Sequence, residues 1–398
     1  MPSVLLIIST LVVLFGSLYQ LVIKEVLFDS FGIGRSIHLI EDFPYSCRRL
    51  QHQQLEACED LWLDEQDRIL YAACTGTNDR LSWNPAMDRL NQSGRRPGGS
   101  QMIAISIDSP GQDGLFDMHP VKSEGYSGEA RDSSLNFLGF DAAVIDPSTI
   151  HFYMVNQRPP VDANNQYVDA TNIGVNATIE IFVHKRGSGI MRHVSTIFSP
   201  EVWSPNRVAI LPDGAFVVSN DHSVKIGFRR KLDPIIGGAT VAYCSPTGVC
   251  HRASTNKLKF PNGLAKGPDG LIYVPGSVDG TIGVFELQDN RMLKEVDVIR
   301  TRMPLDNLAF DANGDLFAAG LPDIPRTMSA FENPYELSSP ATVFRIRKID
   351  NTYHMEKILE DVEGKVLSGV TTAVHDAKTG RLFLGSAISP YMMVCDPK

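Results

Sequence analysis

The sequence predicts an all-β protein: a six-bladed β-propeller closed by its N- and C-terminal strands and preceded by an N-terminal hydrophobic helix. A unit made of a polar turn and a short apolar strand occurs six times. Apolar, strand-like segments precede and follow every unit, as in propeller blades. Cys47 and Cys395 lie at opposite ends of the repeats, where a disulfide would join the first and last strands of a closed ring.

Each repeat begins with a turn rich in Asp, Pro, Asn and Gly and continues with aromatic and β-branched residues that suit a strand. The six units are LDEQDRILYAAC (63–74), IDPSTIHFYMVN (145–156), LPDGAFVVSND (211–221), GPDGLIYVPGS (267–277), DANGDLFAAG (311–320) and DAKTGRLFLGS (376–386). With one strand before and one after, and a fourth from the variable stretch between units, each repeat makes one blade. The propeller is therefore predicted to span residues 47–398.

The first 23 residues carry no charged side chain and are mostly Leu, Ile and Val. This length suits a membrane-spanning helix and also the apolar part of a secretory signal. We predict that residues 1–24 are a signal sequence or a signal anchor and that residues 25–46 connect them to the propeller. A buried core helix is the alternative, although such helices normally keep a polar stripe. Either membrane role sends the chain into the secretory pathway, anchored in the endoplasmic reticulum or secreted.

Other features fit an oxidising, secretory compartment. Asn91 (NQS) and Asn176 (NAT) are N-glycosylation sequons. Cys244 and Cys250 flank the turn SPTGV, which favours a local disulfide, and the partners of the other cysteines stay open. The cysteine spacing matches no zinc pattern. A net charge of -9 argues against a nucleic-acid partner, because such surfaces carry a basic patch.

The innermost strands of a propeller start near the central channel, so residues at these starts meet in space. The predicted starts are Glu59–Asp60, Phe140–Asp141, Asn206–Arg207, Asn262–Gly263, Asp306–Asn307 and Thr371–Thr372. Carboxylate and carboxamide oxygens suit a hard cation such as calcium. We expect its ligands to be two carboxylates and three carboxamides: Glu59, Asp306, Asn206, Asn262 and Asn307. Alternatively, Asn and Asp only form turns here, although turns do not require the same offset in successive blades.

Several motifs resemble one known family. The segments ACEDL, WSPNRVAI, FPNGLA, PLDNLAFD and SNDH, together with the terminal cysteine pair, are similar to the serum paraoxonase/arylesterase family. Its members are calcium-dependent lactonases with a six-bladed propeller and an N-terminal hydrophobic anchor, and the resemblance covers residues 47–395. It implies that the five oxygen residues above hold calcium at the channel floor. It also implies that Asp60 belongs to a second, structural calcium site.

The sequence departs from this family at three positions. Leu138 and Gln157 align with the two histidines that activate water in family lactonases, and neither side chain can act as a general base near neutral pH. Arg207 stands where the second calcium takes an Asp. A guanidinium cannot bind a cation, so we expect Arg207 to pair with Asp60 and to replace that ion. Hydrolysis and a second calcium are therefore both in doubt.

Three long loops are expected to lie over the channel, at residues 157–174, 222–238 and 321–340. Aromatic residues in or beside such loops are candidates for a pocket wall, with packing inside the blades as the alternative: Trp203, Phe137, Phe140, Phe331 and Tyr335. His222, in the SNDH segment, is the one histidine kept from a family position near the site. Its role is either structural hydrogen bonding or catalysis.

The chain also resembles the fungal branch of this family, in which some members are assigned as hetero-Diels–Alder enzymes of tropolone sesquiterpenoid biosynthesis. They couple a tropolone-derived quinone methide to a humulene-type alkene. Our first hypothesis is a non-hydrolytic cyclase of this kind, acting on small hydrophobic metabolites. The second is a calcium-dependent lactonase or arylesterase that uses another base. The third is an inactive, membrane-anchored propeller that binds or chaperones a partner.

Overall fold

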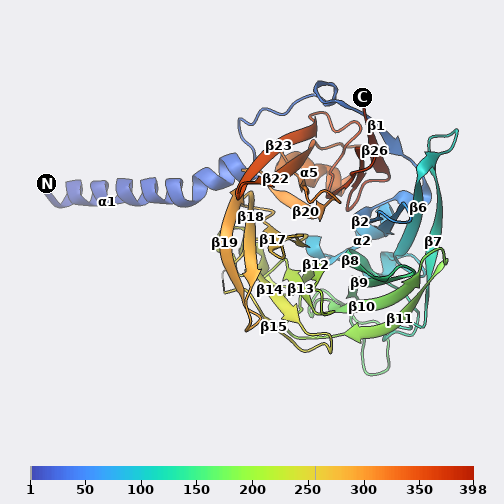
Figure 1. Ribbon diagram of the computed structural model, residues 1–398. Helices are drawn as coiled ribbons and strands as arrows, with labels where there is room; N and C mark the ends of the chain where they lie inside the picture. The colour runs from blue at the N-terminus through green and yellow to red at the C-terminus, as the bar shows by residue number, and fades with distance from the viewer. Residues whose placement is uncertain (1, 256) are drawn as a thin grey trace.

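The computed structural model describes residues 2–255 and 257–398, and Met1, the first residue of the predicted 1–24 segment, lies outside them. The structure is mostly β. Its strands form four four-stranded sheets, one eight-stranded sheet and one two-stranded sheet. The larger sheets stand around a common centre, as Figure 1 shows.

The eight-stranded sheet consists of two antiparallel four-stranded halves that are joined by parallel pairing of β7 with β11. Its strands are β2 (Cys58–Asp64), β3 (Ile69–Cys74), β6 (Gln101–Pro110), β7 (Phe116–Glu124), β8 (Phe137–Asp146), β9 (Thr149–Arg158), β10 (Asn176–Lys185) and β11 (Ile190–Ile197). The two-stranded sheet pairs β4 (Trp83–Asn84) with β5 (Arg89–Leu90).

The other four sheets each contain four strands. The first contains β12 (Pro205–Ile210), β13 (Phe216–Asn220), β14 (Thr240–Cys244) and β15 (Cys250–Arg252). The second contains β16 (Ala265–Lys266), β17 (Ile272–Pro275), β18 (Thr281–Leu287) and β19 (Leu293–Arg300). The third contains β20 (Leu305–Phe310), β21 (Leu316–Gly320), β22 (Ala341–Ile349) and β23 (Thr352–Asp361). The last contains β24 (Thr372–Asp376), β25 (Arg381–Gly385), β26 (Met392–Pro397) and β1 (Tyr45–Leu50).

Six inner strands surround the axis, because β2, β8, β12, β16, β20 and β24 each contact the next and β24 returns to β2. Neighbouring sheets pack through apolar faces. Between the β12 and β16 sheets, for example, the core contains Val217, Val241, Ile272, Val274 and Phe285. The alternation of strand side chains places these residues inside and leaves the turns at the surface.

Three disulfides are present in the described residues. Cys47 on β1 is bonded to Cys395 on β26, and β1 pairs with β26 in the same sheet. The predicted bridge between the two ends of the ring is therefore confirmed. The local bridge between Cys244 and Cys250 is confirmed as well. The third bridge, whose partners the sequence left open, links neighbouring strands β2 and β3.

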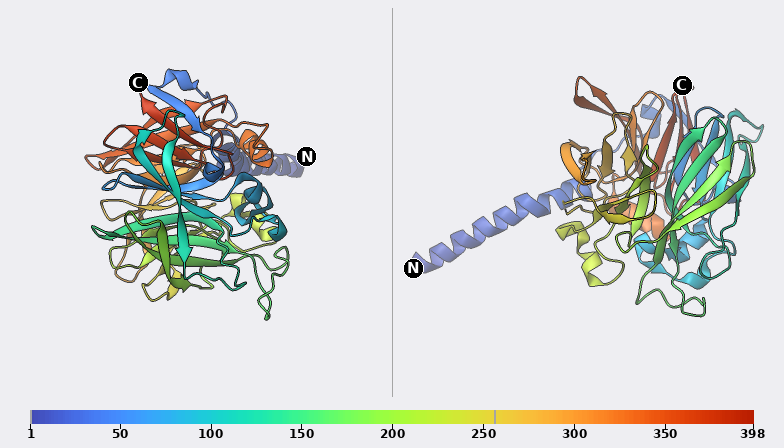
Figure 2. Two further views of the ribbon diagram at one scale, coloured as in Figure 1. Left: turned by 90° about the vertical axis from the view of Figure 1, so that its right-hand side faces the viewer. Right: turned by 60° about the horizontal axis from the view of Figure 1, so that its bottom comes forward.

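The N-terminal segment begins with α1 (Pro2–Leu18), whose helical path continues through π-helices η1 (Tyr19–Ile23) and η2 (Glu25–Ser30). Figures 1 and 2 show α1 standing away from the ring. In the described part of the chain, no helix combines the length and apolarity needed to cross a membrane. The connecting segment is tied to the β20 sheet, because Arg35 donates to the Pro322 carbonyl over 2.6 Å and the His38 N–H donates to Glu360 over 2.7 Å.

Helices occur in segments where the repeats predicted none. They are α2 (Thr77–Ser82), α3 (Phe228–Lys231), α4 (Asp233–Ile236) and α5 (Ile324–Glu332), with 3₁₀ turns η3 (Ile40–Asp42), η4 (Gln53–Leu55), η5 (Pro85–Met87) and η6 (Gln92–Gly94). The α5 helix has a local cause. The Asp323 side chain accepts the N–H of Arg326 over 3.0 Å, and Pro325 lies in the first turn.

Candidate metal centre

Four inner strands, β2, β8, β12 and β20, carry β-bulges near their starts. On β12, Pro205 pairs with Asn220 and Val208 pairs with Val218, so the two residues between them face only Ser219. A bulge re-aims its side chains and places consecutive residues outside the regular alternation. The residues at such bulges are Glu59 on β2, Leu138 and Gly139 on β8, Asn206 and Arg207 on β12, and Asp306 and Asn307 on β20.

Contacts between neighbouring strands bring the bulges around one centre. Ser219 donates from Oγ to the carbonyl of Asn262 over 2.8 Å. A Cβ built on Gly263 would stand 1.7 Å from Asn307 Oδ1, so only glycine allows Asn307 to approach this closely. Asn307 donates from Nδ2 to Glu59 Oε1 over 3.2 Å. The oxygen residues of β2, β12 and β20 and of the turn before β16 therefore lie around one site on the axis.

The five expected ligands are between 1% and 8% exposed. Within the described residues, each has one buried side-chain oxygen without a hydrogen-bond donor: Glu59 Oε2, Asn206 Oδ1, Asn262 Oδ1, Asp306 Oδ1 and Asn307 Oδ1. A buried acceptor without a partner costs about 1–3 kcal/mol. A cation would satisfy all of these oxygens, and two carboxylates with three carboxamides fit calcium. Calcium itself stays a prediction, since the described residues hold no group of three or more His, Cys, Asp or Glu that could bind a metal.

Electrostatics at the centre also favour a cation. Burial and the neighbouring Asp60 raise the pKa of Glu59 to about 7. Burial and then Glu59 raise the pKa of Asp306 well above its ordinary value. Two carboxylates this close cannot both be charged cheaply without a positive charge beside them. A divalent ion would balance both.

Arg207, which the resemblance places where the family has a second calcium, contacts Asp60 and several backbone carbonyls. Its Nε donates to Asp60 Oδ2 over 2.7 Å and to the Phe140 carbonyl over 3.2 Å. Its Nη1 donates to the carbonyls of Leu264 and Leu308. Both members of the ion pair are buried. These residues do not fit a second cation, because the oxygens that would bind it are occupied by guanidinium N–H groups.

The two positions that align with family histidines offer no base. Leu138 is buried in an apolar cluster with Val155 and Val208. Gln157 donates from Nε2 to the Pro205 carbonyl over 3.0 Å, and its Oε1 is buried with no donor among the described residues. Gln157 is therefore fixed in place with an acceptor free, and a carboxamide cannot take up a proton near neutral pH.

Two predicted strand starts were wrong, because β16 begins at Ala265, after Asn262 and Gly263, and β8 begins earlier than predicted. Asp141 does not stand at the start of β8, because the bulge there is formed by Leu138 and Gly139. The Asp141 carboxylate instead accepts the N–H groups of Ala142 and Ile210, each over 2.8 Å. The reason is the length of β8, which starts two residues earlier than the other strands suggest. The second blade therefore brings an apolar side chain to the ring where other blades bring oxygen.

His222 is the histidine placed beside the centre. Its Nδ1 lies 2.7 Å from Asp221 Oδ1, and its ring meets Phe260 edge to face at 4.5 Å. Asp221 is fully buried, and its Oδ2 has no donor within the described residues. Sequence reasoning missed Asp221, although it directly precedes His222 in the SNDH segment. A carboxylate that orients an imidazole is an arrangement used for proton transfer.

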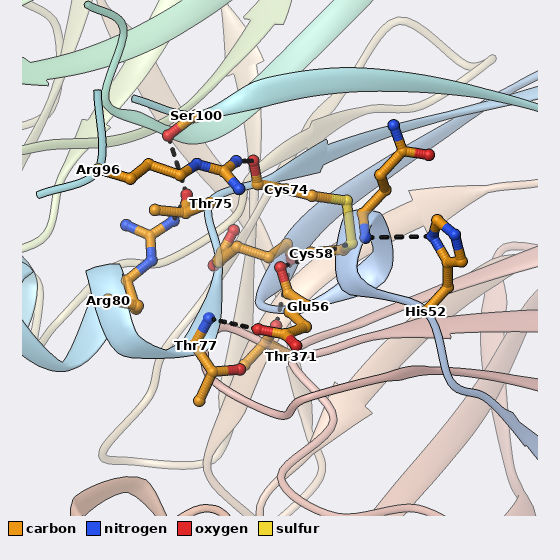
Figure 3. The surroundings of a disulfide bond; sticks show 12 residues. His52, Glu56, Cys58, Cys74, Thr75, Thr77, Arg80, Arg96, Ser100 and Thr371 are labelled. Carbon is orange, nitrogen blue, oxygen red and sulfur yellow. Dashed lines mark hydrogen bonds between the residues drawn. A yellow bond between two sulfur atoms is a disulfide. The ribbon is translucent and has the colours of Figure 1, made fainter. Parts of the chain in front are cut away.

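Arg80 was also missed. It is 2% exposed and donates from Nη2 to Thr75 Oγ1 over 3.0 Å and to the Phe137 carbonyl over 2.8 Å. Burial lowers its pKa to about 10, and Glu59 partly offsets this effect. Figure 3 shows Arg80 on its helix, facing Thr75. No sequence pattern pointed to Arg80, because α2 lies in a stretch that the repeats do not share.

The aromatic candidates divide into two groups. Phe137 and Phe140 are core residues that pack with Phe152, so they do not form a pocket wall. Trp203 donates from Nε1 to the His222 carbonyl over 2.8 Å and lies beside the centre. Phe331 is buried on α5 and Tyr335 is 54% exposed.

Of the two glycosylation sequons, Asn91 is exposed. Asn176 is half-buried, and its side-chain amide donates to Glu129 over 2.5 Å.

Comparison with known proteins identifies relatives. The family model described as Arylesterase matches residues 93–396. Serum paraoxonase/arylesterase 1 of Rattus norvegicus is 25% identical over 286 residues, which cover 70% of this chain and 74% of the relative. The Mus musculus protein of the same name is 25% identical over 270 residues, or 66% of this chain and 69% of the relative.

Solved structures with a similar backbone have low sequence identity. A gluconolactonase of Xanthomonas campestris superposes with a TM-score of 0.49 and 14% identity, over 91% of this chain and 94% of that chain. A luciferin-regenerating enzyme superposes with a TM-score of 0.49 and 11% identity, over 88% of this chain and 95% of that chain.

We expect the protein to bind one equivalent of calcium. Asp306→Asn keeps the shape of the side chain and removes one of two ligand charges, so it should weaken calcium binding about tenfold or more. Isothermal titration of chelator-treated protein with calcium measures the stoichiometry and the affinity of binding. Glu286→Gln, which changes an exposed carboxylate on β18, is the control and should bind like the wild type. Equal affinity of Asp306→Asn and wild type would contradict the site.

Arg207→Met should lower the free energy of unfolding by about 3–5 kcal/mol, because it leaves Asp60 buried without its cation. Denaturant unfolding measures this loss, and Asp60→Asn in the same chain should recover part of it. Arg207→Asp, the residue type that the family resemblance implies here, should bind a second equivalent of calcium. If the free energy of unfolding of Arg207→Met is within about 1 kcal/mol of the wild-type value, the Arg207–Asp60 ion pair does not stabilise the fold as we expect.

Proposed function

Because the chain belongs to the arylesterase family, we propose that it is a six-bladed propeller enzyme that binds a small, apolar, carbonyl-bearing substrate over one axial calcium ion. Six inner strands close into a ring, and each begins an antiparallel set of four strands, which supports six blades. We propose further that it is a non-hydrolytic member. Its best candidate reaction is an intermolecular hetero-Diels–Alder cyclisation between a tropolone-derived quinone methide and a humulene-type alkene.

The observation that carries the non-hydrolytic proposal is the chemistry of two positions. An apolar side chain, Leu138, and a fixed carboxamide, Gln157, stand where the family resemblance implies a histidine pair. Hydrolysis needs a base to activate water, and these groups supply none. The five oxygen residues proposed to bind calcium nevertheless each keep a buried oxygen without a donor among the described residues. The site is thus equipped to bind and polarise a ligand but not to deliver water from these two positions.

The five oxygen residues would hold the calcium: Glu59, Asn206, Asn262, Asp306 and Asn307. When bound, the ion would polarise a carbonyl of the ligand. Leu138 is packed in the apolar core and supplies no base, and the Oε1 of Gln157, which has no donor among the described residues, can accept a hydrogen bond from a ligand hydroxyl. These side chains orient a ligand without transferring a proton to it.

A cycloaddition needs only that its two reactants are bound and oriented. The oxygen and the methide carbon of the quinone methide form one C–O and one C–C bond to the two alkene carbons. No atom leaves, and no proton or electron is transferred. Holding the two reactants in a reactive geometry can lower the barrier by about 7–11 kcal/mol.

The full chain is tested with a quinone methide precursor and humulenol, and products are followed by chiral chromatography. We expect the adduct to form faster and with higher stereoselectivity than in buffer. Gln157→Leu should reduce this acceleration, since it removes the acceptor that would orient the ligand, while the control Glu286→Gln keeps it. The same rate and product mixture with and without protein would exclude the cyclase.

The Asp221–His222 pair favours a second candidate, a calcium-dependent lactonase or arylesterase. His222 would take a proton from water while Asp221 orients its ring. This activity predicts hydrolysis of aryl esters or lactones that is lost with a chelator and falls about 10²-fold or more in His222→Gln. His119→Gln, at an exposed histidine, is the control. Turnover of neither substrate class would leave a binding propeller as the remaining hypothesis.

The same proposal includes the route of the chain. Three disulfides in the described residues fit folding in an oxidising compartment. We propose that residues 1–24 direct the protein into the secretory pathway as a signal or an anchor. The apolar side chains of α1, such as Leu6, Leu11 and Phe15, are exposed to solvent and suit contact with lipid.

A further inference from the structure

The Cys58–Cys74 disulfide lies next to the candidate metal centre. Cys58 directly precedes Glu59 in the sequence. Cys74 lies opposite Cys58 on β3, and the Cα atoms of the two cysteines are 3.9 Å apart. Both cysteines are buried, at 0% and 2% exposed. Of the three disulfides in the described residues, the other two lie elsewhere. One joins the two ends of the ring, and one closes the turn between β14 and β15.

The disulfide fixes the bulge that carries Glu59. In the β2–β3 ladder, Cys58 pairs with Cys74 and Asp60 pairs with Ala73, which leaves Glu59 as the extra residue. Cys58 is also the first residue of β2, and beyond it the pairing continues only through two backbone hydrogen bonds, from Thr75 N–H to the Ala57 carbonyl over 3.2 Å and from Gly76 N–H to the Glu56 carbonyl over 3.1 Å. Strand ends fray, and a slip of one residue moves every side chain to the other face of a sheet. A covalent bond at this pair prevents that slip.

Few other contacts hold Glu59. Its backbone carbonyl accepts Asn307 Nδ2 and Thr371 Oγ1, each over 3.2 Å. Its Oε1 accepts the same Asn307 amide, and its Oε2 has no donor within the described residues. These three hydrogen bonds to Glu59 are each 3.2 Å long, which is at the long end for hydrogen bonds. The covalent bond beside Glu59 is therefore the strongest local constraint on its position.

The disulfide also connects Glu59 with the second blade. Thr75 follows Cys74, and its Oγ1 is hydrogen-bonded to Ser100 Oγ over 2.9 Å. The same Oγ1 accepts a hydrogen bond from Arg80 Nη2. Ser100 Oγ accepts the N–H of Phe137 over 2.9 Å, and Arg80 donates to the carbonyl of the same residue. Figure 3 shows the disulfide together with Thr75, Ser100 and Arg80. One continuous network thus extends from Glu59 to the residue before Leu138.

We propose that the Cys58–Cys74 disulfide is a positioning element of the axial cation site: it holds the β2 bulge so that Glu59 Oε2 remains in the oxygen set. This inference rests on the calcium site of the proposed function. It assigns to the bridge a role in metal affinity, beyond a contribution to stability. Outer contacts that orient metal ligands typically change affinity by 10–100-fold when they are removed.

The test compares two double variants of the full chain. Cys58→Ala/Cys74→Ala should raise the calcium dissociation constant about tenfold or more, toward that of Glu59→Gln. The control, Cys244→Ala/Cys250→Ala, removes another bridge between directly paired residues and should leave the constant unchanged. Calcium titration gives the constants. The luminescence lifetime of bound terbium reports an added water ligand where Glu59 has withdrawn, which a loss of global stability does not produce.

Each outcome decides one question. If the wild type binds no calcium, the axial site of the proposed function is wrong. If the wild type binds and the Cys58→Ala/Cys74→Ala protein binds equally well, with an unchanged lifetime, the positioning role is overturned. If that variant does not fold, Cys58→Val/Cys74→Ala refills the apolar volume and is evaluated in the same way. Failure of both to fold, while the control folds, would overturn the inference, because the bridge would then serve the fold and not the site.

Discussion

The centre of the molecule depends on the buried ion pair between Arg207 and Asp60. A ring of sheets brings backbone carbonyls of several inner strands to one axis, where no strand can pair with them. The Arg207 guanidinium donates to Asp60 and also to the carbonyls of Phe140, Leu264 and Leu308. Its rigid, planar set of N–H groups suits this arrangement, and these partners offset the cost of burying the charges. The inner strands are thus joined by a side chain of the protein itself.

The bulges separate this structural centre from the candidate metal centre. Glu59 and Asp60 are adjacent in sequence, yet one faces the oxygen set and the other faces Arg207, because the bulge puts only Glu59 outside the β2–β3 ladder. The same holds on β12, where Asn206 has an unpaired oxygen and the next residue, Arg207, forms the ion pair. Substitutions at the chemical site can therefore change ligands while the axis stays intact. This separation explains how a complete oxygen set coexists with an apolar residue at position 138.

The repeated offset of polar residues singled out five oxygen residues, each of which has a buried oxygen without a donor among the described residues. Residue type and blade position together predicted Glu59, Asp306 and the three asparagines, and the resemblance predicted the Arg207–Asp60 pair. Strand register could not be predicted, since a bulge changes it without changing composition. For that reason the start of β8 was placed at Phe140–Asp141, whereas the bulge is at Leu138 and Gly139. Arg80 depends on a contact between α2 and β8, and the pairing of Cys58 with Cys74 depends on the register of β2 against β3; no local sequence pattern encodes either.

The unpaired oxygens limit which states the protein can occupy. Five buried acceptors without donors would cost on the order of 5–15 kcal/mol at about 1–3 kcal/mol each, as much as the whole stability of a typical domain. A fold does not keep so many polar groups unsatisfied, so protons, buried water or a cation must reach them. The raised pKa values of Glu59 and Asp306 show that protonation is one solution, but it satisfies only the carboxylates. The carboxamide oxygens of Asn206, Asn262 and Asn307 do not titrate near neutral pH, and a shared cation satisfies them together with both carboxylates.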